Sequence, residues 1–442
     1  MNRLKMNYSF LTFLVFISQA FGDIKPQQVH ISLGEDPFSM VITWVTFEYA
    51  PTPIILYGPT IATTLRYPYG HTNNFTYNNV TRYVHTGTLS NLEPNTKYYY
   101  KVGTIEGWSG LFNFTTFPAG NDFKFRVCCF GDLAYRHGNI ILDLFDAARN
   151  GWFDMIIHVG DIAYDLHSDD CDGNCGDKFM TELEPIFSHI PYMVIAGNHE
   201  NDHHNFSHFH NRFRMPGEVG GHHNNQYYSF NLGAAHFFGV STEHYGYMDE
   251  YGKAPILSQY SWLTSDLQEA NKNRATRPWI IGYQHRPFYC SNTECHEDDE
   301  PLIRKGDHDI PGLEPVYISN KIDLVFCGHM HSYERFYPIA NLVSNGGNGY
   351  DSCKDTSSVY HNAAAPAYIV TGSAGCHTPK TSFGSPHLGS ACRSDDWGYT
   401  IMSVYNHTHI HLYQWSVDQQ RNVDNIWITK FIGNFTAPGP TT

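Results

Sequence analysis

Five short clusters of polar residues could carry chemistry, because each follows directly on a run of apolar residues. They contain carboxylates, an amide, a phenol and imidazoles, which supply the oxygen and nitrogen atoms that metal ions bind in proteins. A single aspartate or histidine in such a place is usually a helix cap or a hydrogen-bonded loop residue. Five together predict a shared metal site. The clusters are Gly131-Asp132-Leu133, Gly160-Asp161-Ile162-Ala163-Tyr164, Gly197-Asn198-His199-Glu200, Gln284-His285-Arg286-Pro287 and Gly328-His329-Met330-His331-Ser332-Tyr333-Glu334-Arg335.

Strands and helices must alternate to position these clusters. Continuous apolar strands joined by helices are typical of a sheet that is covered on both faces. Ligands bind such sheets beyond the carboxyl ends of the strands, which is where the clusters fall. We therefore expect an α/β domain with a layered β-sheet core covered by helices over residues 122–434. Its predicted strands are 125–130, 155–159, 192–196, 279–283 and 324–327, and its predicted helices include 140–149, 179–187 and 262–270.

Residues 23–119 predict a separate all-β domain. Short alternating runs such as 40–45 and 97–102 are separated by turn signals and show no helical periodicity, which favours a β-sandwich. Residues 89–100 resemble the tyrosine-corner region of fibronectin type III domains, and Trp44 would then belong to the core. The linker is expected at residues 118–121, and we assign this domain no chemistry.

The first 22 residues predict a secretory signal peptide. Arg3 and Lys5 precede a short apolar run at 10–17, and the small residue Gly22 marks the expected cleavage site. The apolar run is far shorter than the roughly 20 residues that a bilayer crossing needs. We expect a soluble protein in extracellular fluid or in a lysosome-like acidic compartment. Six N-glycosylation sequons agree with this route, at Asn74, Asn79, Asn113, Asn205, Asn406 and Asn434.

The charge of the chain excludes some partners. Lys and Arg number 28 against 43 Asp and Glu, a formal net charge of −15, which argues against nucleic acid or an anionic membrane as a partner. Attraction for an anionic substrate must then be local, and bound metal would supply it. The 27 histidines agree with a metal site. The sequence leaves the oligomeric state open, with a dimer as one alternative.

The ten cysteines do not form a dense disulfide scaffold in a chain of this length. Three fall inside apolar runs, where a thiol packs as a small hydrophobic group. Two pairs lie in polar loops, where local disulfides are expected in an oxidising compartment. The pairing of three more stays open. The first set is Cys128, Cys129 and Cys327, the loop pairs are Cys171 with Cys175 and Cys290 with Cys295, and the open set is Cys353, Cys376 and Cys392.

The five clusters, in this order, resemble the signature of purple acid phosphatases within the calcineurin-like metallophosphoesterase superfamily. The resemblance covers residues 125–335. Tyr164 and the trailing Tyr-Glu-Arg at 333–335 separate this family from its relatives. The preceding sandwich and the loop Cys290-Ser291-Asn292 are most similar to the long-form animal branch, the acid phosphatase type 7-like enzymes.

The resemblance implies a centre of Fe(III) and a divalent ion, zinc in preference to iron or manganese. Hard carboxylate and phenolate oxygens suit Fe(III), and the phenolate gives a purple charge-transfer colour. An amide and two imidazoles suit the divalent ion, with one carboxylate bridging both ions. The ferric ion would take Asp132, Asp161, Tyr164 and His331, and the divalent ion would take Asp161, Asn198, His285 and His329.

The implied reaction is hydrolysis of phosphate monoesters, with a metal-bound hydroxide as nucleophile. His199 would donate a proton or hydrogen bond to the leaving group, the alternative being that it only orients a ligand. Asn198 and His296 would contact the substrate. Two other functions stay open: a phosphodiesterase or nucleotidase on the same core, and a non-catalytic iron-binding glycoprotein.

One position departs from the family pattern. The first cluster normally reads Asp-x-Gly, whereas this chain has Asp132-Leu133-Ala134. If the turn needs a positive φ or a close backbone approach, alanine strains it by about 1 kcal/mol. All seven ligand types are present, so we expect a functional site with slightly altered geometry.

Overall fold

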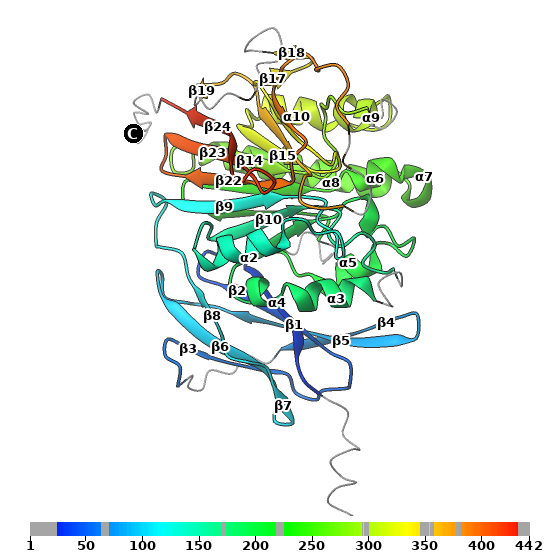
Figure 1. The fold of residues 1–442 in the computed structure, drawn as a ribbon, viewed down its shortest axis with the longest axis vertical. Coiled ribbons are helices and arrows are strands. Elements are labelled where there is room, and N and C mark those ends of the chain that lie inside the picture. The colour runs from blue at the N-terminus through cyan, green and yellow to red at the C-terminus, as the bar shows by residue number, and fades with distance from the viewer. Residues whose placement is uncertain are drawn as a thin grey trace, which may run out of the picture.

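A computed structural model describes residues 24–62, 70–168, 174–217, 225–293, 295, 300–344, 353, 358–376, 380 and 382–431. The predicted signal peptide, His296, Cys171 and the sequon at Asn434 lie outside these residues. Within the described part of the chain, no helix is both long and apolar enough to cross a membrane. Figure 1 shows a β-sandwich at one end of the molecule, followed by a layered α/β body.

The sandwich consists of two antiparallel four-stranded sheets, which confirms the predicted all-β domain. Trp44 is buried in its core. The hydroxyl of Tyr98 accepts a hydrogen bond of 2.9 Å from the backbone N–H of Glu93, as a tyrosine corner does. One sheet has the order β1 (Gln27–Leu33), β2 (Met40–Thr46), β5 (Val80–Leu89), β4 (His71–Tyr77), and the other contains β3 (Ile54–Gly58), β6 (Lys97–Thr104), β7 (Gly107–Trp108) and β8 (Phe112–Thr115).

The α/β body contains two seven-stranded sheets, each with a parallel core. The first has the order β11 (Tyr192–Ile195), β10 (Met155–Val159), β9 (Phe125–Phe130), β22 (Gly398–Val404), β23 (His409–Ser416), β24 (Arg421–Thr429), β19 (Ser358–His361). The second has the order β12 (Tyr227–Leu232), β13 (Ala235–Val240), β14 (Trp279–Tyr283), β15 (Leu324–Cys327), β20 (Ala367–Thr371), β16 (Tyr333–Phe336), β21 (Ser390–Ser394). A small hairpin pairs β17 (Ile339–Ala340) with β18 (Val343–Ser344).

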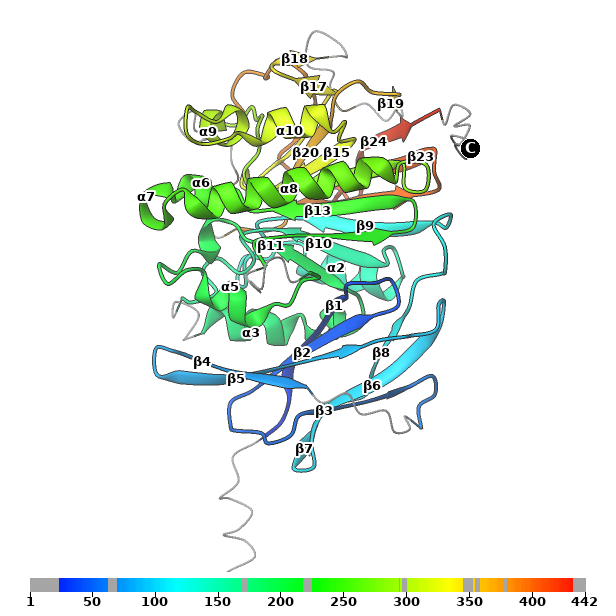
Figure 2. The ribbon, with the colours of Figure 1, turned by 180° about the vertical axis from the view of Figure 1, so that it is seen from behind.

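Helices cover the outer face of each sheet, and the two sheets pack against each other (Figures 1 and 2). The rings of Phe125 in β9 and Phe237 in β13 lie 6.1 Å apart across this core. Each central strand is therefore buried on both faces, which explains its continuous apolar sequence. The first sheet is covered by α2 (Ile141–Arg149), α3 (Cys175–Glu182), α4 (Glu184–Phe187) and α5 (Ser207–Arg212), and beyond the second lie α6 (Glu243–Gly246), α7 (Met248–Tyr251), α8 (Ala254–Lys272), α9 (Glu300–Lys305) and α10 (Leu313–Ser319).

The predicted layered α/β architecture is confirmed, with small differences in the elements. The helix expected over 179–187 is two helices, α3 and α4, because Pro185 in the first turn of α4 cannot continue the hydrogen-bond ladder. The helix expected over 262–270 begins earlier, at Ala254. The last strands within the described residues, β22 to β24, extend the first sheet beside β9.

A buried ionic cluster joins the sandwich to the α/β body. The Asp177 carboxylate in α3 lies 2.6 Å from Arg82 of β5 and 2.8 Å from Arg212 of α5. Gln28 of β1 also donates a hydrogen bond to it at 3.1 Å. Burial alone would raise the pKa of Asp177, but the two guanidinium groups outweigh burial and hold this pKa well below its usual value. The joint therefore depends on a permanently ionised carboxylate.

The histidine-rich stretch 203–210 is partly misread by sequence alone. His203-His204 and His208-Phe209-His210 follow no predicted strand end, so the sequence favours solvated loops there, with adventitious metal binding as the alternative. His203 is indeed largely exposed. His208, however, lies in α5, is 1 % exposed and packs against Tyr77 of β4 with ring centroids 4.5 Å apart. Its neighbour across the joint is a sandwich strand far away in sequence, so local context gives no sign of its burial.

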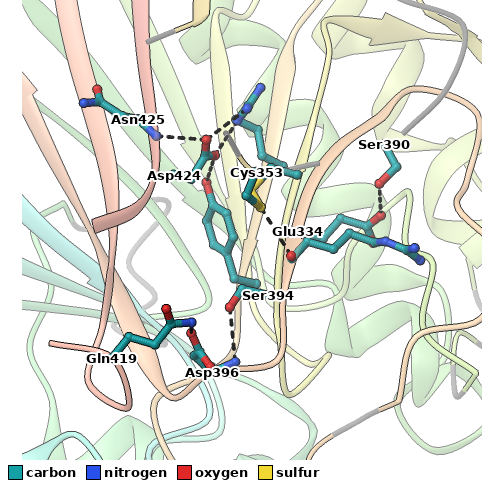
Figure 3. Close-up of a disulfide and its surroundings, with 12 residues drawn as sticks. Glu334, Cys353, Ser390, Ser394, Asp396, Gln419, Asp424 and Asn425 are labelled. Carbon is teal, nitrogen blue, oxygen red and sulfur yellow. Dashed lines mark hydrogen bonds and ion pairs between the residues drawn. A yellow bond between two sulfur atoms is a disulfide. The ribbon is translucent and has the colours of Figure 1, made fainter. Parts of the chain in front are cut away.

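The cysteine predictions are largely supported. Cys128, Cys129 and Cys327 are buried in strands β9 and β15, and the disulfide between Cys290 and Cys295 is present. Cys175 is disulfide-bonded, while its predicted partner lies outside the described residues. The open set contains a disulfide between Cys353 and Cys392 of β21. Figure 3 shows this disulfide beside the buried side chains of Glu334 and Asp424.

Candidate metal centre

The carboxyl ends of five parallel strands meet at one edge of the α/β body, and all seven predicted ligands follow these strands. Strands β9, β10 and β11 belong to the first sheet, whereas β14 and β15 belong to the second. Both sheets therefore contribute to one site, as expected for ligands beyond the carboxyl ends of strands. Asp132 follows β9, Asp161 and Tyr164 follow β10, Asn198 follows β11, His285 follows β14, and His329 and His331 follow β15.

The loops that carry these residues are strained in the same way. Asp132, Asp161, Tyr164 and His329 have φ angles of 61°, 51°, 51° and 70°. The left-handed region costs an L-residue roughly 1–2 kcal/mol, and such strain collects at functional sites. Gly160 has a φ of 91°, and a Cβ atom there would lie 2.5 Å from Nδ1 of His285. Only glycine fits at this turn, which lets His285 approach the loop of Asp161.

One group of ligand atoms comes from Asp132, Tyr164 and His331. The phenolic oxygen of Tyr164 lies 2.5 Å from Nε2 of His331 and 3.4 Å from Oδ1 of Asp132. Nε2 of His331 is 3.6 Å from the same carboxylate oxygen. Two hard oxygens and one imidazole nitrogen thus converge on one point, which is a donor set that suits a hard cation.

A second group comes from Asp161, Asn198, His285 and His329. Ligand atoms of the two histidines and Asp161 all lie within 4.8 Å of one another. Nε2 of His285 is 3.3 Å from Oδ1 of Asp161 and 3.1 Å from Oδ1 of Asn198. Nδ1 of His285 lies 2.8 Å from the Val159 carbonyl and donates to it, which leaves Nε2 to face the site, as in metal-binding histidines.

The charges of the site fit bound cations. Asp132 and Asp161 are buried, and within the described parts of the chain neither pairs with a lysine or arginine. Burial raises the pKa of Asp132 well above its usual value. Burial also disfavours the charged form of His285, yet the Asp161 carboxylate raises the pKa of this imidazole to about 10. Buried carboxylates of this kind need positive charge beside them, and a donor set of oxygens and imidazole nitrogens suits metal ions as its source.

His199 stands next to both groups and is open to solvent, since its side chain is 27 % exposed. Nε2 lies 4.0 Å from Oδ2 of Asp161, and Nδ1 lies 2.9 Å from Oδ1 of Asp165. Burial would lower the pKa of His199, but these two carboxylates raise it to about 9. With Asp165 orienting its ring, His199 is placed to donate a proton beside the site.

The site also contains two residues that the predicted set does not include. Asp165 directly follows Tyr164 and turns back, with a φ of 64°, to orient His199. Glu200 is buried and accepts hydrogen bonds from the backbone N–H groups of Asp161, Ile162 and Gly197, at 2.8, 2.9 and 2.8 Å. Its position in the third cluster is the only sequence signal for it. Glu200 fixes the loops after β10 and β11 relative to each other.

Ala134 adopts the conformation for which the family pattern has glycine. Its φ is 64°, and its buried methyl group packs against Tyr164 and Cys376. The turn after the first ligand therefore needs a positive φ, and the strain of about 1 kcal/mol expected from the sequence applies.

Substitutions at Ala134 should separate strain from packing. Glycine relieves this strain of about 1 kcal/mol, but it loses about 0.8 kcal/mol of methyl burial and about 0.4–1 kcal/mol of chain entropy. The free energy of unfolding of Ala134→Gly should thus stay within about 1 kcal/mol of the parent chain. A β-branched residue is a true outlier at positive φ. The free energy of unfolding of Ala134→Val should therefore fall by several times the change expected for Ala134→Gly. Urea unfolding measures both, and equal stability of the two variants would contradict the observed backbone angle.

Three family models match successive parts of the chain. Residues 26–116 match the purple acid phosphatase N-terminal domain. Residues 125–333 match the calcineurin-like phosphoesterase model. Residues 365–425 match the model described as iron/zinc purple acid phosphatase-like protein C. The matched regions cover the sandwich, the five strands that the predicted ligands follow, and strands β20 to β23 with part of β24.

Individual relatives match over nearly the whole chain. Acid phosphatase type 7 of Mus musculus is 38 % identical over 423 residues, which cover 93 % of each chain. The Fe(3+)-Zn(2+) purple acid phosphatase 12 of Arabidopsis thaliana is 28 % identical over 92 % of this chain and 85 % of its own. The structure of the purple acid phosphatase PPD1 from yellow lupin seeds, 22 % identical, covers 92 % of this chain and 75 % of its own with a TM-score of 0.75, which shows a shared fold.

Proposed function

The chain belongs to the purple acid phosphatase family of metal-dependent phosphoesterases, and on that premise we propose that it is a secreted acid phosphatase that hydrolyses phosphate monoesters. The observation that carries the proposal is the convergence of seven side chains into two adjoining groups at the carboxyl ends of five strands. The name of the mouse relative supports the same activity.

We further propose Fe(III) in the group of Asp132, Tyr164 and His331, and a divalent ion, zinc by preference, in the group of Asn198, His285 and His329. Phenolate and carboxylate oxygens favour the ferric ion, and amide and imidazole ligands favour the divalent one. Asp161 lies beside both groups and would help to hold both ions. The metals named for the Arabidopsis relative support this assignment.

Bound there, the two ions would polarise the phosphate ester and supply an activated water as nucleophile. The residues of the chain do the rest. His199 holds a proton at Nε2 beside the site, and Asp165 fixes the orientation of its ring through Nδ1. A histidine so placed can protonate the leaving oxygen. Contact of Asn198 and His296 with the substrate is part of the proposal, and His296 lies outside the described residues.

Steady-state assays with purified protein of known metal content test the proposed activity. We expect turnover of an aryl phosphate monoester to exceed that of a bis-aryl phosphate diester, at acidic pH. Preference for the diester would favour a phosphodiesterase. Absence of turnover with two ions per chain would favour an iron-binding glycoprotein. N-terminal sequencing of the secreted protein should begin at Asp23.

Substitution of Tyr164 tests the ferric assignment. Tyr164→Phe removes the only phenol among the seven predicted ligands, so the visible charge-transfer band should disappear while phosphatase activity falls. An absorption spectrum and an iron analysis of the same sample measure both effects. Phe and Tyr fill the same buried space, so the fold should persist. A variant that keeps the band would show that Tyr164 is not the source of the colour.

A further inference from the structure

A groove runs between the sandwich and the α/β body, on the side of strand β8. Its volume is about 530 Å³, which lies in the range of roughly 300–1,000 Å³ that small ligands occupy. The sandwich contributes Asn95 and Asn113, the linker contributes Pro118, and the α/β body contributes Arg126, Asp154 and His189. The groove thus lies where the two parts of the molecule meet.

Strand β8 brings a predicted glycosylation site to this groove. Asn113 in β8 begins the sequon Asn113-Phe114-Thr115, and both Asn113 and Thr115 line the groove. Asn113 is partly buried, whereas the other sequon asparagines within the described residues, Asn74, Asn79, Asn205 and Asn406, are exposed. A glycan on Asn113 would begin where the sandwich and the α/β body both line the groove.

The backbone of Asn113 already forms part of the joint. Nδ1 of His189 lies 2.6 Å from the Asn113 carbonyl oxygen and donates to it, and the ring of His189 packs edge-on against Phe112 at 5.7 Å. Next to it, the hydroxyl of Tyr100 donates to the Ser188 carbonyl at 2.7 Å. A group attached at Asn113 begins directly beside this contact.

The lining suits a carbohydrate. Arg126 and Asp154 form an ion pair of 2.7 Å with side chains 33 % and 35 % exposed, which can exchange hydrogen bonds with sugar hydroxyls. Pro118, Ile190 and Pro191 offer apolar surface. Sugar rings have both hydroxyl groups and apolar C–H faces, so a groove with both kinds of lining can hold them.

We propose that an N-linked glycan on Asn113 lies in this groove and fastens the sandwich to the α/β body. The inference rests on the secretory route proposed above. Attachment forms a bond from Nδ2 of Asn113 to the anomeric carbon of the first N-acetylhexosamine. The bond from that carbon to a lipid diphosphate carrier breaks, the carrier leaves with the electron pair, and the amide loses one proton.

Protection from a glycosidase tests the position of this glycan. Asn74 provides a matched control, because it begins the same tripeptide, Asn74-Phe75-Thr76, also in a strand, but is exposed. In the native secreted protein, peptide-N-glycosidase should release the glycan at Asn74 at least tenfold faster than that at Asn113. After denaturation the two rates should agree. Equal release from the native protein would overturn the proposal.

Stability tests whether the glycan fastens the two parts. Asn113→Gln in glycosylated protein should lower the thermal midpoint by about 2 °C or more and speed proteolytic cleavage of the linker at 118–121, whereas Asn74→Gln should change neither. In protein made without glycosylation, Asn113→Gln should have no effect, which separates the glycan from the asparagine side chain. If Asn113→Gln made with glycosylation is as stable as the parent protein, the proposal is overturned.

Mass spectrometry of the glycopeptides distinguishes failure of the glycan proposal from failure of the proposed function. Glycans at other sequons with Asn113 unmodified would overturn this inference alone. A secreted protein with no glycan at any sequon would overturn it as well, without touching the proposed phosphatase activity. A protein that is never secreted would contradict the proposed secretion too.

Discussion

Replacing His199 with alanine is expected to lower kcat for a phosphate monoester by about 10²–10⁴-fold, the usual contribution of general acid catalysis, with both metal ions retained. Nε2 of His199 lies beside the site, 4.0 Å from Asp161, but the ring binds Asp165 through its other nitrogen and remains 27 % exposed. That geometry suits a proton donor to a substrate better than a ligand. Steady-state kinetics and metal analysis of the same preparation provide the measurement.

Two further substitutions sharpen the test of His199. Asp165→Asn keeps the imidazole but removes the carboxylate that orients it, so kcat should fall by about 10–100-fold. His203→Ala is the matched control: this histidine is 72 % exposed and pairs with Glu250, so kcat should not change. If His199→Ala loses a metal ion, the residue is a ligand and the assigned role is wrong.

Replacing Asp177 with alanine is expected to destabilise the protein by about 3–5 kcal/mol, because it leaves Arg82 and Arg212 buried without their counter-charge. The side chains of the two arginines are 0 % and 1 % exposed. Urea or thermal unfolding measures the loss. Asp146→Ala is the control, since Asp146 pairs with Arg149 at 3.4 Å on the surface, and its effect should stay within about 0.5 kcal/mol.

The stabilisation that the Asp177 carboxylate provides should persist at acidic pH. The folded-state pKa of Asp177 lies well below that of the unfolded chain, so its stabilisation is fully present above the unfolded value of about 3.9 and is lost only as pH falls through the folded value. The difference between parent and variant should therefore be the same at pH 7 and pH 5. In the double variant Asp177→Ala with Arg212→Met, removal of one positive charge should recover part of the stability. Additive effects would show that the charges are not coupled.

The strands that position the site can be predicted from the sequence, because the pattern that marks each of them lies within its own residues. Residues 125–130, 155–159, 279–283 and 324–327 are strands in the structure with the predicted bounds. Each is a buried, apolar run that ends in a polar cluster. Since parallel strands of one sheet present their carboxyl ends at one edge, the closeness of Asp132 and Asp161, which follow the neighbouring strands β9 and β10, follows from the pattern. Their meeting with His331, which follows β15 of the second sheet, depends on the packing of the two sheets.

Other features depend on tertiary contacts and leave no local signal. Asp165 reaches His199 only because its backbone adopts a positive φ, which is unusual for a residue other than glycine. The burial of His208 depends on Tyr77, a residue of the sandwich. The disulfide of Cys353 joins it to Cys392 of β21, 39 positions away in the chain. Sequence periodicity describes single elements, and these contacts join elements that are distant in the chain.

The division of the seven side chains between two sheets has a consequence for folding. Strands β9, β10 and β11 can form one parallel unit, and β14 and β15 another, but neither alone holds a complete donor set. Tight metal affinity should therefore appear only after the two sheets dock, at the end of refolding. In a stopped-flow experiment, the visible colour would then lag behind the far-ultraviolet signal of the strands, and the lag would time the docking of the sheets.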